Sequence, residues 1–294
     1  MAQMNPRQDG ARKSSSWSAA DFNRLLAIPP GAVLALFFLV PIFGVIWRSF
    51  SDPAIGLLNY RRLFTDGPYL QSLWLTITTA LMVTVLCLVT AYPVAYVMAR
   101  ARTSIQQLIG ALVVIPLWTS VVIRSYAWMV VFQRRGILNQ ALTSTGLVDT
   151  PVNFIPGSIA VYVGMVHIML PFMILPLVAN MRSIDGRLLA AAGVLGATPA
   201  QAFLRIFLPL SLPGVLAGSA LVFMMSLGFY ITPALLGGPR HMMAAVLIEE
   251  QANRQLDWGL ASALATVLLV LTVAVYSVYV RLSNRVEGGL AHGR

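Results

Sequence analysis

Six long apolar segments separated by shorter polar stretches dominate the chain. Each approaches or exceeds the roughly 20 residues that a helix needs to cross a bilayer. The pattern therefore predicts an all-α integral membrane protein with six transmembrane helices. The expected spans are Leu26–Trp47, Leu70–Met98, Ile105–Ile123, Ser158–Met181, Leu212–Tyr230 and Gly259–Val280.

Polar tails flank the transmembrane domain, which we expect to cover residues 25–285. Residues 1–24 are rich in serine and arginine and predict a disordered cytoplasmic tail, whereas residues 286–294 predict a short cytoplasmic C-terminal tail. The apolar run after residue 24 is too long for the core of a signal peptide, and no small-residue cleavage pattern follows it. We therefore expect an uncleaved first helix.

Composition and charge agree with a membrane protein. The chain is 58% hydrophobic and 10% charged, whereas soluble domains carry about 25% charged residues. The net charge of +10 could indicate nucleic-acid binding, but the Lys and Arg residues lie mostly between the apolar segments. This placement is typical of charges that orient the spans, so we expect no nucleic-acid partner. Twelve of these residues fall on the side that holds both tails and eight on the other, so the positive-inside rule predicts cytoplasmic termini.

Prolines lie within several of the predicted spans. Each removes a helix hydrogen bond and favours a kink, which a bilayer tolerates where neighbouring helices or a cavity satisfy the freed carbonyl. Several kinks favour a moving or pathway-lining bundle, with harmless packing kinks as the alternative. The prolines are Pro41, Pro93, Pro116, Pro171 and Pro176.

A polar segment over residues 184–209 interrupts the apolar pattern and predicts a cytoplasmic helical hairpin. Asp185 can cap a first short helix, and Gly196 allows the chain to turn after it. Thr198 and Gln201 have the spacing of a capping box that starts a second helix. The small residues near the turn leave a surface that a partner can approach closely, and a compact interfacial loop is the alternative.

The hairpin resembles the EAA loop of ABC importer permeases, whose pattern is E-A-A-x-x-x-G-x9-I-x-L-P. Ala190 stands where that family has glutamate, which puts one polar contact to the ATPase in doubt. The matching positions are Ala191, Ala192, Gly196, Ile206, Leu208 and Pro209. In that family the loop is a coupling helix that inserts into a cleft of the ATPase subunit. The resemblance implies that the coupling residues are Asp185, Ala190, Ala191, Ala192, Gly196, Ala197, Thr198, Gln201, Phe203 and Pro209.

Further segments look like the spermidine/putrescine branch of these permeases. They are Asn59–Phe64, Ala91–Tyr96, Ile115–Ser120, Arg124–Trp128, Leu170–Met173 and Thr232–Gly238. The resemblance implies a multi-pass subunit of the bacterial inner membrane that forms half of a path for a polyamine. Its implied partners are an ATPase dimer, a second and non-identical permease, and a periplasmic binding protein. A permease for another small solute, such as an amino acid derivative, is the alternative.

Catalytic and metal-binding patterns are absent from the sequence. No G-x-x-x-x-G-K-[ST] loop occurs, so we expect no enzyme activity, with ATP and Mg²⁺ bound by the partner ATPase. His167, His241 and His292 lack metal-ligand spacing, and Cys87 is the single cysteine, so no cofactor is expected. We expect His167, within the fourth span, to be a hydrogen-bonded packing residue.

A cationic solute needs carboxylates and aromatic faces along its route. The candidates for this path are Trp118, Arg124, Tyr126, Trp128, Tyr230, Glu249 and Glu250. A solvated loop helix is the alternative for the acids, and an interfacial belt is the alternative for the aromatics. Arg124 argues against a wholly cation-friendly mouth unless an acid pairs with it.

Two other classes of function fit the sequence less well. A secondary transporter that works without ATP predicts inverted repeats and an intramembrane ion site, but the sequence shows no repeat and no acid at a span centre. A membrane-embedded enzyme needs clustered His, Asp or Cys residues in the spans, and the sequence shows no such cluster.

Overall fold

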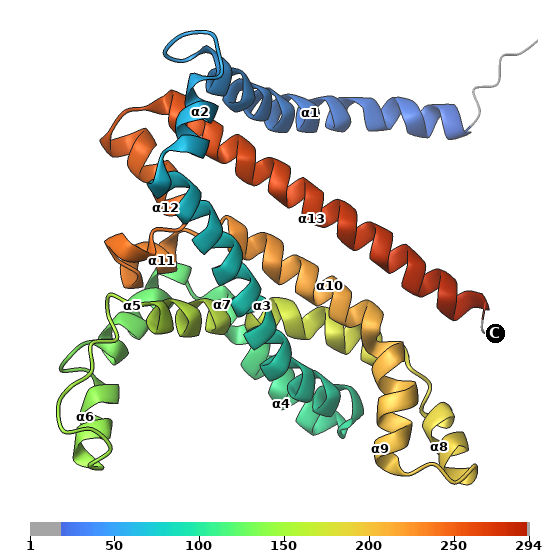
Figure 1. Ribbon diagram of the computed structural model, residues 1–294. Helices are drawn as coiled ribbons and strands as arrows, with labels where there is room; N and C mark the ends of the chain where they lie inside the picture. The colour runs from blue at the N-terminus through green and yellow to red at the C-terminus, as the bar shows by residue number, and fades with distance from the viewer. Residues whose placement is uncertain (1–18, 293–294) are drawn as a thin grey trace, which may run out of the picture. The chain divides into compact units, whose positions relative to one another are not determined.

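In the computed structural model, residues 19–292 are described, with side chains for residues 28–239 and 241–285. Every regular element in this part is a helix (Figure 1). The α-helices are α1 Ala19–Ser51, α2 Leu58–Thr65, α3 Gly67–Arg100, α4 Thr103–Val114, α5 Val121–Phe132, α6 Ile137–Ser144, α7 Ser158–Ser183, α8 Gly186–Val194, α9 Pro199–Ala202, α10 Leu208–Leu227, α11 Ile231–Leu236, α12 Ala244–Glu249 and α13 Trp258–His292. The short 3₁₀ and π segments are η1 Ile115–Trp118, η2 Phe203–Phe207, η3 Pro239–His241 and η4 Glu250–Arg254.

Met1–Trp47 and Arg48–Arg294 form two separate compact units. In the first unit, α1 is long and apolar enough to cross a membrane from Ile28 onward. Residues 1–18 of the predicted N-terminal tail lie outside the described residues. The rest of that predicted tail is helical, because α1 begins at Ala19. At the other end, α13 continues through residues predicted as a C-terminal tail as far as His292.

Five of the six predicted spans are single helices among the described residues, but the third is not. Residues 103–118 and 121–144 meet at an angle of 100°, so the predicted helix Ile105–Ile123 was wrong as one straight element. Pro116 starts the 3₁₀ turn η1, and Ser120 starts α5 by accepting a hydrogen bond from the Val122 amide at 3.3 Å. The count of six holds when this bent pair is taken as one span.

The fifth span starts earlier than predicted. Helical structure is continuous from Pro199 to Leu227, whereas Leu212 was expected as its first residue. The Leu208 amide donates to the Phe203 carbonyl, five residues back, which makes η2 a π segment. This wider turn immediately precedes Pro209, whose ring and missing N–H disturb an ordinary α-turn. Pro209 therefore lies inside a continuous helix, and the second arm of the hairpin is rigidly joined to α10.

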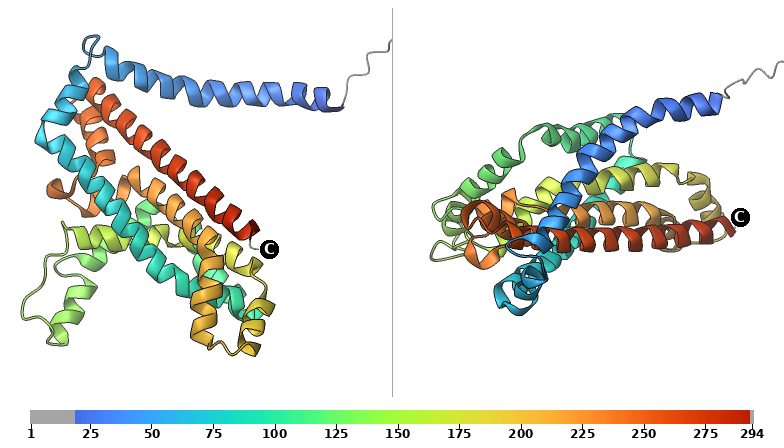
Figure 2. Two further views of the ribbon diagram at one scale, coloured as in Figure 1. Left: turned by 45° about the vertical axis from the view of Figure 1, so that its right-hand side comes forward. Right: turned by 90° about the horizontal axis from the view of Figure 1, so that it is seen from above.

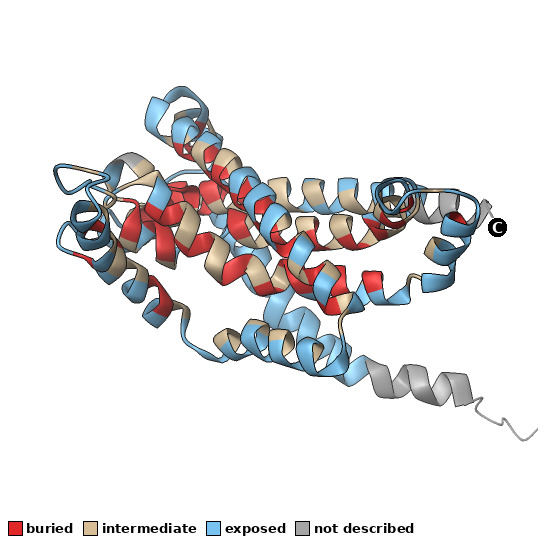
Figure 3. Ribbon diagram, turned by 90° about the horizontal axis from the view of Figure 1, so that it is seen from below, coloured by how far each residue is buried: buried red, intermediate tan, exposed pale blue. Residues whose placement is uncertain are grey.

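The core of the second unit lies where α3, α7 and α10 pack together (Figure 3). At Gly218 in α10, an added Cβ atom would lie 2.8 Å from the Met173 sulfur on α7, so the missing side chain lets these helices approach closely. Helix α13 packs against α10. Helices α3, α7 and α13 run toward the end of this unit that holds α8 and α9, whereas α10 runs away from it (Figures 1 and 2).

At the other end of the unit, Asp257 makes two interactions, one with the start of α13 and one with α2. Its Oδ1 atom accepts a hydrogen bond from the Leu260 amide at 3.0 Å and so caps α13. Its Oδ2 atom accepts a hydrogen bond from Arg62 Nη1 in α2 at 2.8 Å. This hydrogen bond raises the pKa of the Arg62 guanidinium above its ordinary range, so the arginine stays charged at any pH at which the protein is handled.

The two interactions of Asp257 can be separated by substitution. Asp257→Asn keeps a capping oxygen but loses the charge, so we expect a small destabilisation of up to about 1 kcal/mol, similar to that of Arg62→Gln. Asp257→Ala loses both interactions and should cost about 1–2 kcal/mol. Melting temperatures of the purified protein in detergent test this order. Equal melting temperatures for the Asn and Ala variants would show that the cap contributes nothing.

Candidate functional site

The α8–α9 hairpin begins where the sequence predicts. The Asp185 carboxylate accepts a hydrogen bond from the Arg187 amide at 2.9 Å and caps α8. Small side chains follow, and Ala190 and Ala191 are exposed whereas Ala192 is buried. Ala190, which stands where the family has glutamate, is thus on the exposed surface of α8.

Gly196 makes the turn between the two helices. Its φ angle is +87°, a conformation that side-chain-bearing residues rarely adopt. The reversal closes with a hydrogen bond from the Ala197 amide to the Ala192 carbonyl at 2.9 Å, and another from the Leu195 amide to the Ala191 carbonyl at 3.1 Å. These are the contacts of a glycine-based helix end, which confirms the predicted turn.

The second helix starts with the predicted capping box. The Gln201 amide donates to Thr198 Oγ1 at 3.3 Å, and the Thr198 amide donates to Gln201 Oε1 at 3.0 Å. Pro199 occupies the first helical position, where its missing N–H costs no hydrogen bond. The hairpin tip is therefore fixed by local hydrogen bonds at both of its helix ends.

The tip of the hairpin presents two apolar side chains that sequence reasoning did not select. Val194 is 89% exposed and Leu195 is 88% exposed. Two adjacent, nearly fully exposed aliphatic residues held on a rigid turn form a surface suited to burial against a partner. Their place immediately before the turn glycine was the available signal, because residues at the tip of a hairpin project away from its own packing.

An aromatic cluster joins the hairpin to α3. Phe203 and Phe207 stack with their ring centres 5.7 Å apart, and Tyr96 meets their rings edge-on at 5.6 and 5.0 Å. Phe207 is fully buried, and the Arg100 guanidinium lies 5.0 Å from the centre of its ring. Of this cluster only Phe203 was predicted as a coupling residue, because the contacts span about a hundred positions of sequence.

A hydrogen bond next to the aromatic cluster also links α3 to α10. The hydroxyls of Tyr92 in α3 and Ser211 in α10 lie 2.8 Å apart. The Tyr92 ring also meets Phe203 edge-on, with a centre-to-centre distance of 6.2 Å. The hairpin is thereby linked to α3 through these side chains and to α10 through the continuous helix.

The aromatic residues predicted for the transport path differ in their exposure. Trp118, Tyr126 and Tyr230 are exposed. Trp128 instead packs inward, where its indole N–H donates to His167 Nδ1 at 3.2 Å and its ring stacks on Phe132. His167 therefore has the hydrogen-bonded packing role that the sequence predicts.

The predicted charged path residues do not pair with one another. Glu250 accepts an ion-pair contact from Arg254 at 3.4 Å, and Glu249 is partly exposed. Arg124 is buried in α5, and neither glutamate is its ion-pair partner. No group of three or more His, Cys, Asp or Glu within the described residues could hold a metal ion.

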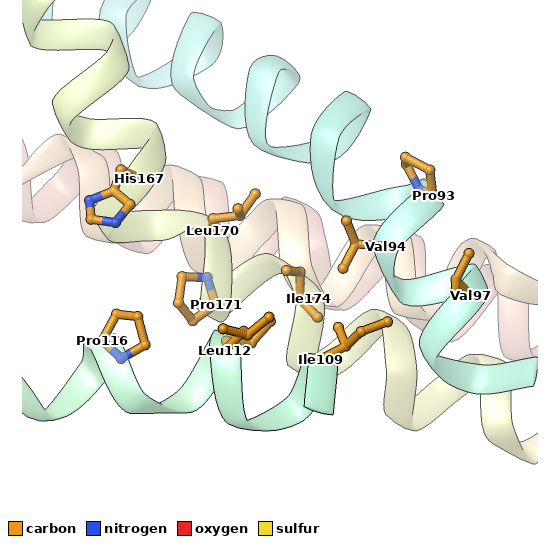
Figure 4. Close-up of a pocket in the computed structure, with 11 residues that line it drawn as sticks. Pro93, Val94, Val97, Ile109, Leu112, Pro116, His167, Leu170, Pro171 and Ile174 are labelled. Carbon is orange, nitrogen blue, oxygen red and sulfur yellow. The ribbon is translucent and has the colours of Figure 1, made fainter. Parts of the chain in front are cut away.

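A cleft of about 520 Å³ lies between α3, α7 and the α4–η1 segment (Figure 4). Three of the span prolines line it, namely Pro93, Pro116 and Pro171. His167 supplies polar atoms, and the rest of the lining is aliphatic. Three of the five span prolines thus border one space, but the cleft carries no carboxylate and cannot select a cation by charge.

Known proteins resemble this chain in sequence. The family described as "Binding-protein-dependent transport system inner membrane component" matches residues 91–288. The spermidine/putrescine transport system permease protein PotB of Haemophilus influenzae is 36% identical over 263 residues, which cover 86% of this chain and 92% of the relative. PotB of Escherichia coli K12 is 34% identical over 259 residues, covering 85% and 94%.

The fold is also found in solved structures. A chain of the bacterial alginate ABC transporter, in complex with an alginate pentasaccharide-bound periplasmic protein, matches with a TM-score of 0.73 and 20% identity. The match covers 91% of this chain and 96% of the other. The chain is thus a transport component and not an enzyme, and it belongs to the family of binding-protein-dependent transport system inner membrane components.

Proposed function

We propose that the chain is the permease subunit of an ATP-driven ABC importer for a polyamine such as spermidine or putrescine. The observation that carries the proposal is the similarity to two spermidine/putrescine permeases over more than four-fifths of the chain. The chain forms half of the translocation path in the inner membrane. The hairpin, whose sequence resembles the ATPase-docking loop of ABC importer permeases, is its proposed contact with the ATPase.

Several partners follow from this proposal. A dimer of ATPase subunits binds ATP and Mg²⁺ and receives the tip at Val194 and Leu195. A second, non-identical permease completes the path, and a periplasmic binding protein delivers the solute. Membrane lipid surrounds the outward faces of the spans, and no cofactor is bound by this chain.

The proposed mechanism is alternating access. Closure of the ATPase dimer on binding ATP displaces the hairpin, which is fixed at Gly196 and joined without interruption to α10. The aromatic cluster around Phe207 carries the same displacement to α3. Both helices border α7 in the core, so their movement opens the path outward, and hydrolysis of ATP resets it.

The proposed orientation places both termini and the hairpin in the cytoplasm. The excess of Lys and Arg on that side supports it. The end of α13 also lies at the same end of its unit as the hairpin (Figure 2). A fluorescent protein fused to the C-terminus should fluoresce in cells, since this reporter matures in the cytoplasm; a dark but membrane-inserted fusion would reverse the orientation.

Uptake by the reconstituted transporter tests the substrate. Proteoliposomes that contain both permeases and the ATPase, with the cognate binding protein outside and ATP inside, should accumulate labelled spermidine. Accumulation should stop when a non-hydrolysable ATP analogue replaces ATP. ATP-driven uptake of another solute without any uptake of spermidine or putrescine would overturn the polyamine assignment but keep the permease assignment.

A further inference from the structure

A cluster of four exposed arginines lies at the end of the second unit that holds the hairpin. Arg100 is the last residue of α3, and Arg102 directly precedes α4. Arg182 lies in the last turn of α7, and Arg187 lies in the first turn of α8. Because α3 and α7 are long and apolar enough to span the membrane, their ends mark the level of the lipid headgroups.

Contacts between these helix ends bring the arginines together. The Arg182 Nη2 atom donates a hydrogen bond to Gln106 Oε1, in the first turn of α4, at 3.2 Å. The Arg100 Nη1 atom lies 3.6 Å from the position that a Cβ atom would take at Gly186, the residue before Arg187. The arginines of the cluster therefore surround one place, where α3, α4, α7 and α8 meet.

The positive charge of the cluster is not neutralised by this part of the chain. Residues 91–110 and 175–214 contain five arginines and a single acid, Asp185. The Asp185 carboxylate accepts a hydrogen bond from the Arg187 amide, and none of the three ion pairs among the described side chains involves an arginine of the cluster. Guanidinium groups bind phosphate through paired hydrogen bonds, so the cluster favours an anion that carries a phosphate.

The apolar cleft of about 520 Å³ begins next to the cluster, on its membrane side (Figure 4). Val97 lines the cleft three residues before Arg100, and Ile109 lines it three residues after Gln106. Helix α3 rises about 10 Å between Pro93, which also lines the cleft, and Arg100. This depth fits within one leaflet, because half of the hydrocarbon core is about 15 Å thick.

The two features together select the chemistry of the ligand. The walls of the cleft are aliphatic apart from His167, so they suit a hydrocarbon chain and not a polar solute. A polyamine is repelled by the arginines, and a free phosphate leaves the cleft empty. A basic pocket between spans at the cytoplasmic side is typical of a site for an anionic lipid headgroup.

We propose that the cleft and the arginine cluster form one site for an anionic phospholipid. The phosphate binds to the arginines at the helix ends, and one acyl chain lies between α3, α4 and α7. A zwitterionic phospholipid binds less well, because its ammonium group is repelled by the same arginines. The site belongs to the membrane component itself and does not depend on which solute is carried.

Photolabelling of the assembled transporter in detergent tests this site without any substitution. The probe is a phosphatidylglycerol with a photoreactive diazirine in its acyl chain, and peptide mapping should place the label on the cleft-lining parts of α3, α4 and α7. A phosphatidylcholine with the same chain should label them at least fivefold less. Equal labelling by the two lipids would show unselective contact with lipid and would overturn the proposal. Labelling of the isolated chain but not of the assembled transporter would assign the cleft to the second permease, with the same consequence.

Loss of charge tests the headgroup end of the site. The double variant Arg102→Gln, Arg182→Gln should lower labelling by the phosphatidylglycerol probe at least fivefold. The matched control is Arg134→Gln, Arg135→Gln, which removes two exposed arginines outside the cluster and should leave labelling unchanged. Undiminished labelling of the first variant would show that the arginines do not select the lipid.

Filling of the cleft tests the acyl-chain end. Ile109→Trp places an indole in the cleft and should lower labelling at least fivefold, whereas Leu108→Trp enlarges an exposed neighbour on α4 that does not line the cleft and should not. An excess of inorganic phosphate should not displace the probe. Displacement by phosphate, together with normal labelling of Ile109→Trp, would mean that the arginines bind a free anion and that the lipid site is wrong.

Discussion

Replacing Val194 and Leu195 together by aspartate is expected to abolish association with the ATPase subunit. Burial of each side chain against a partner is worth about 1.5–3 kcal/mol, so the pair contributes roughly 3–6 kcal/mol to docking. Loss of that contribution corresponds to a fall in affinity of at least about a hundredfold. The two new carboxylates add a cost of desolvation in the same direction. Copurification of the ATPase with the affinity-tagged permease measures the result.

The fold of the permease should survive this change. Both side chains are almost fully exposed, and the hydrogen bonds that close the turn involve main-chain atoms and the side chains of Thr198 and Gln201. The matched control is Ile55→Asp, since Ile55 is 84% exposed and lies in the loop at the opposite end of the unit. Undiminished recovery of the ATPase with the double variant would place the docking surface elsewhere on the chain.

Local rules accounted for the hairpin because its stabilising contacts are local. The caps of α8 and α9 and the turn at Gly196 each involve residues within five positions of one another. Helix capping and glycine preference are properties of short sequences, so they can be read without knowledge of the fold. The same holds for the apolar length of the spans, since the bilayer fixes that length independently of tertiary contacts.

Contacts between distant residues could not be predicted in the same way. The pairing of Arg62 with Asp257 joins positions 195 residues apart, and the Tyr92–Ser211 contact joins positions 119 apart. The third span was also predicted as one helix, because the sequence is apolar on both sides of the 100° bend and the apolar pattern does not mark the bend. The fifth span was predicted to start only at Leu212, whereas a π turn before Pro209 lets the helix run continuously from Pro199.

Replacing Phe207 by alanine is expected to separate ATP hydrolysis from transport. Removal of a fully buried phenylalanine costs about 3–5 kcal/mol, and here the lost contacts are those that join the hairpin to α3 through Tyr96, Phe203 and Arg100. The tip at Val194 and Leu195 is unchanged, so the ATPase should still copurify. The number of spermidine molecules imported per ATP hydrolysed should fall at least fivefold.

Two controls distinguish a broken link from a general loss of stability. Phe207→Leu keeps an apolar side chain but loses the edge-on aromatic contacts, each worth about 0.5–1.5 kcal/mol, so an intermediate coupling ratio is expected. Phe64→Ala removes an equally large ring from an exposed position on α2 and should leave the ratio unchanged. A lower melting temperature with a normal coupling ratio for Phe207→Ala would assign the cluster to stability alone. Since the docking tip and the cluster are separate surfaces, the tip variant should lose the ATPase, while the Phe207 variant should keep it and use its ATP without import.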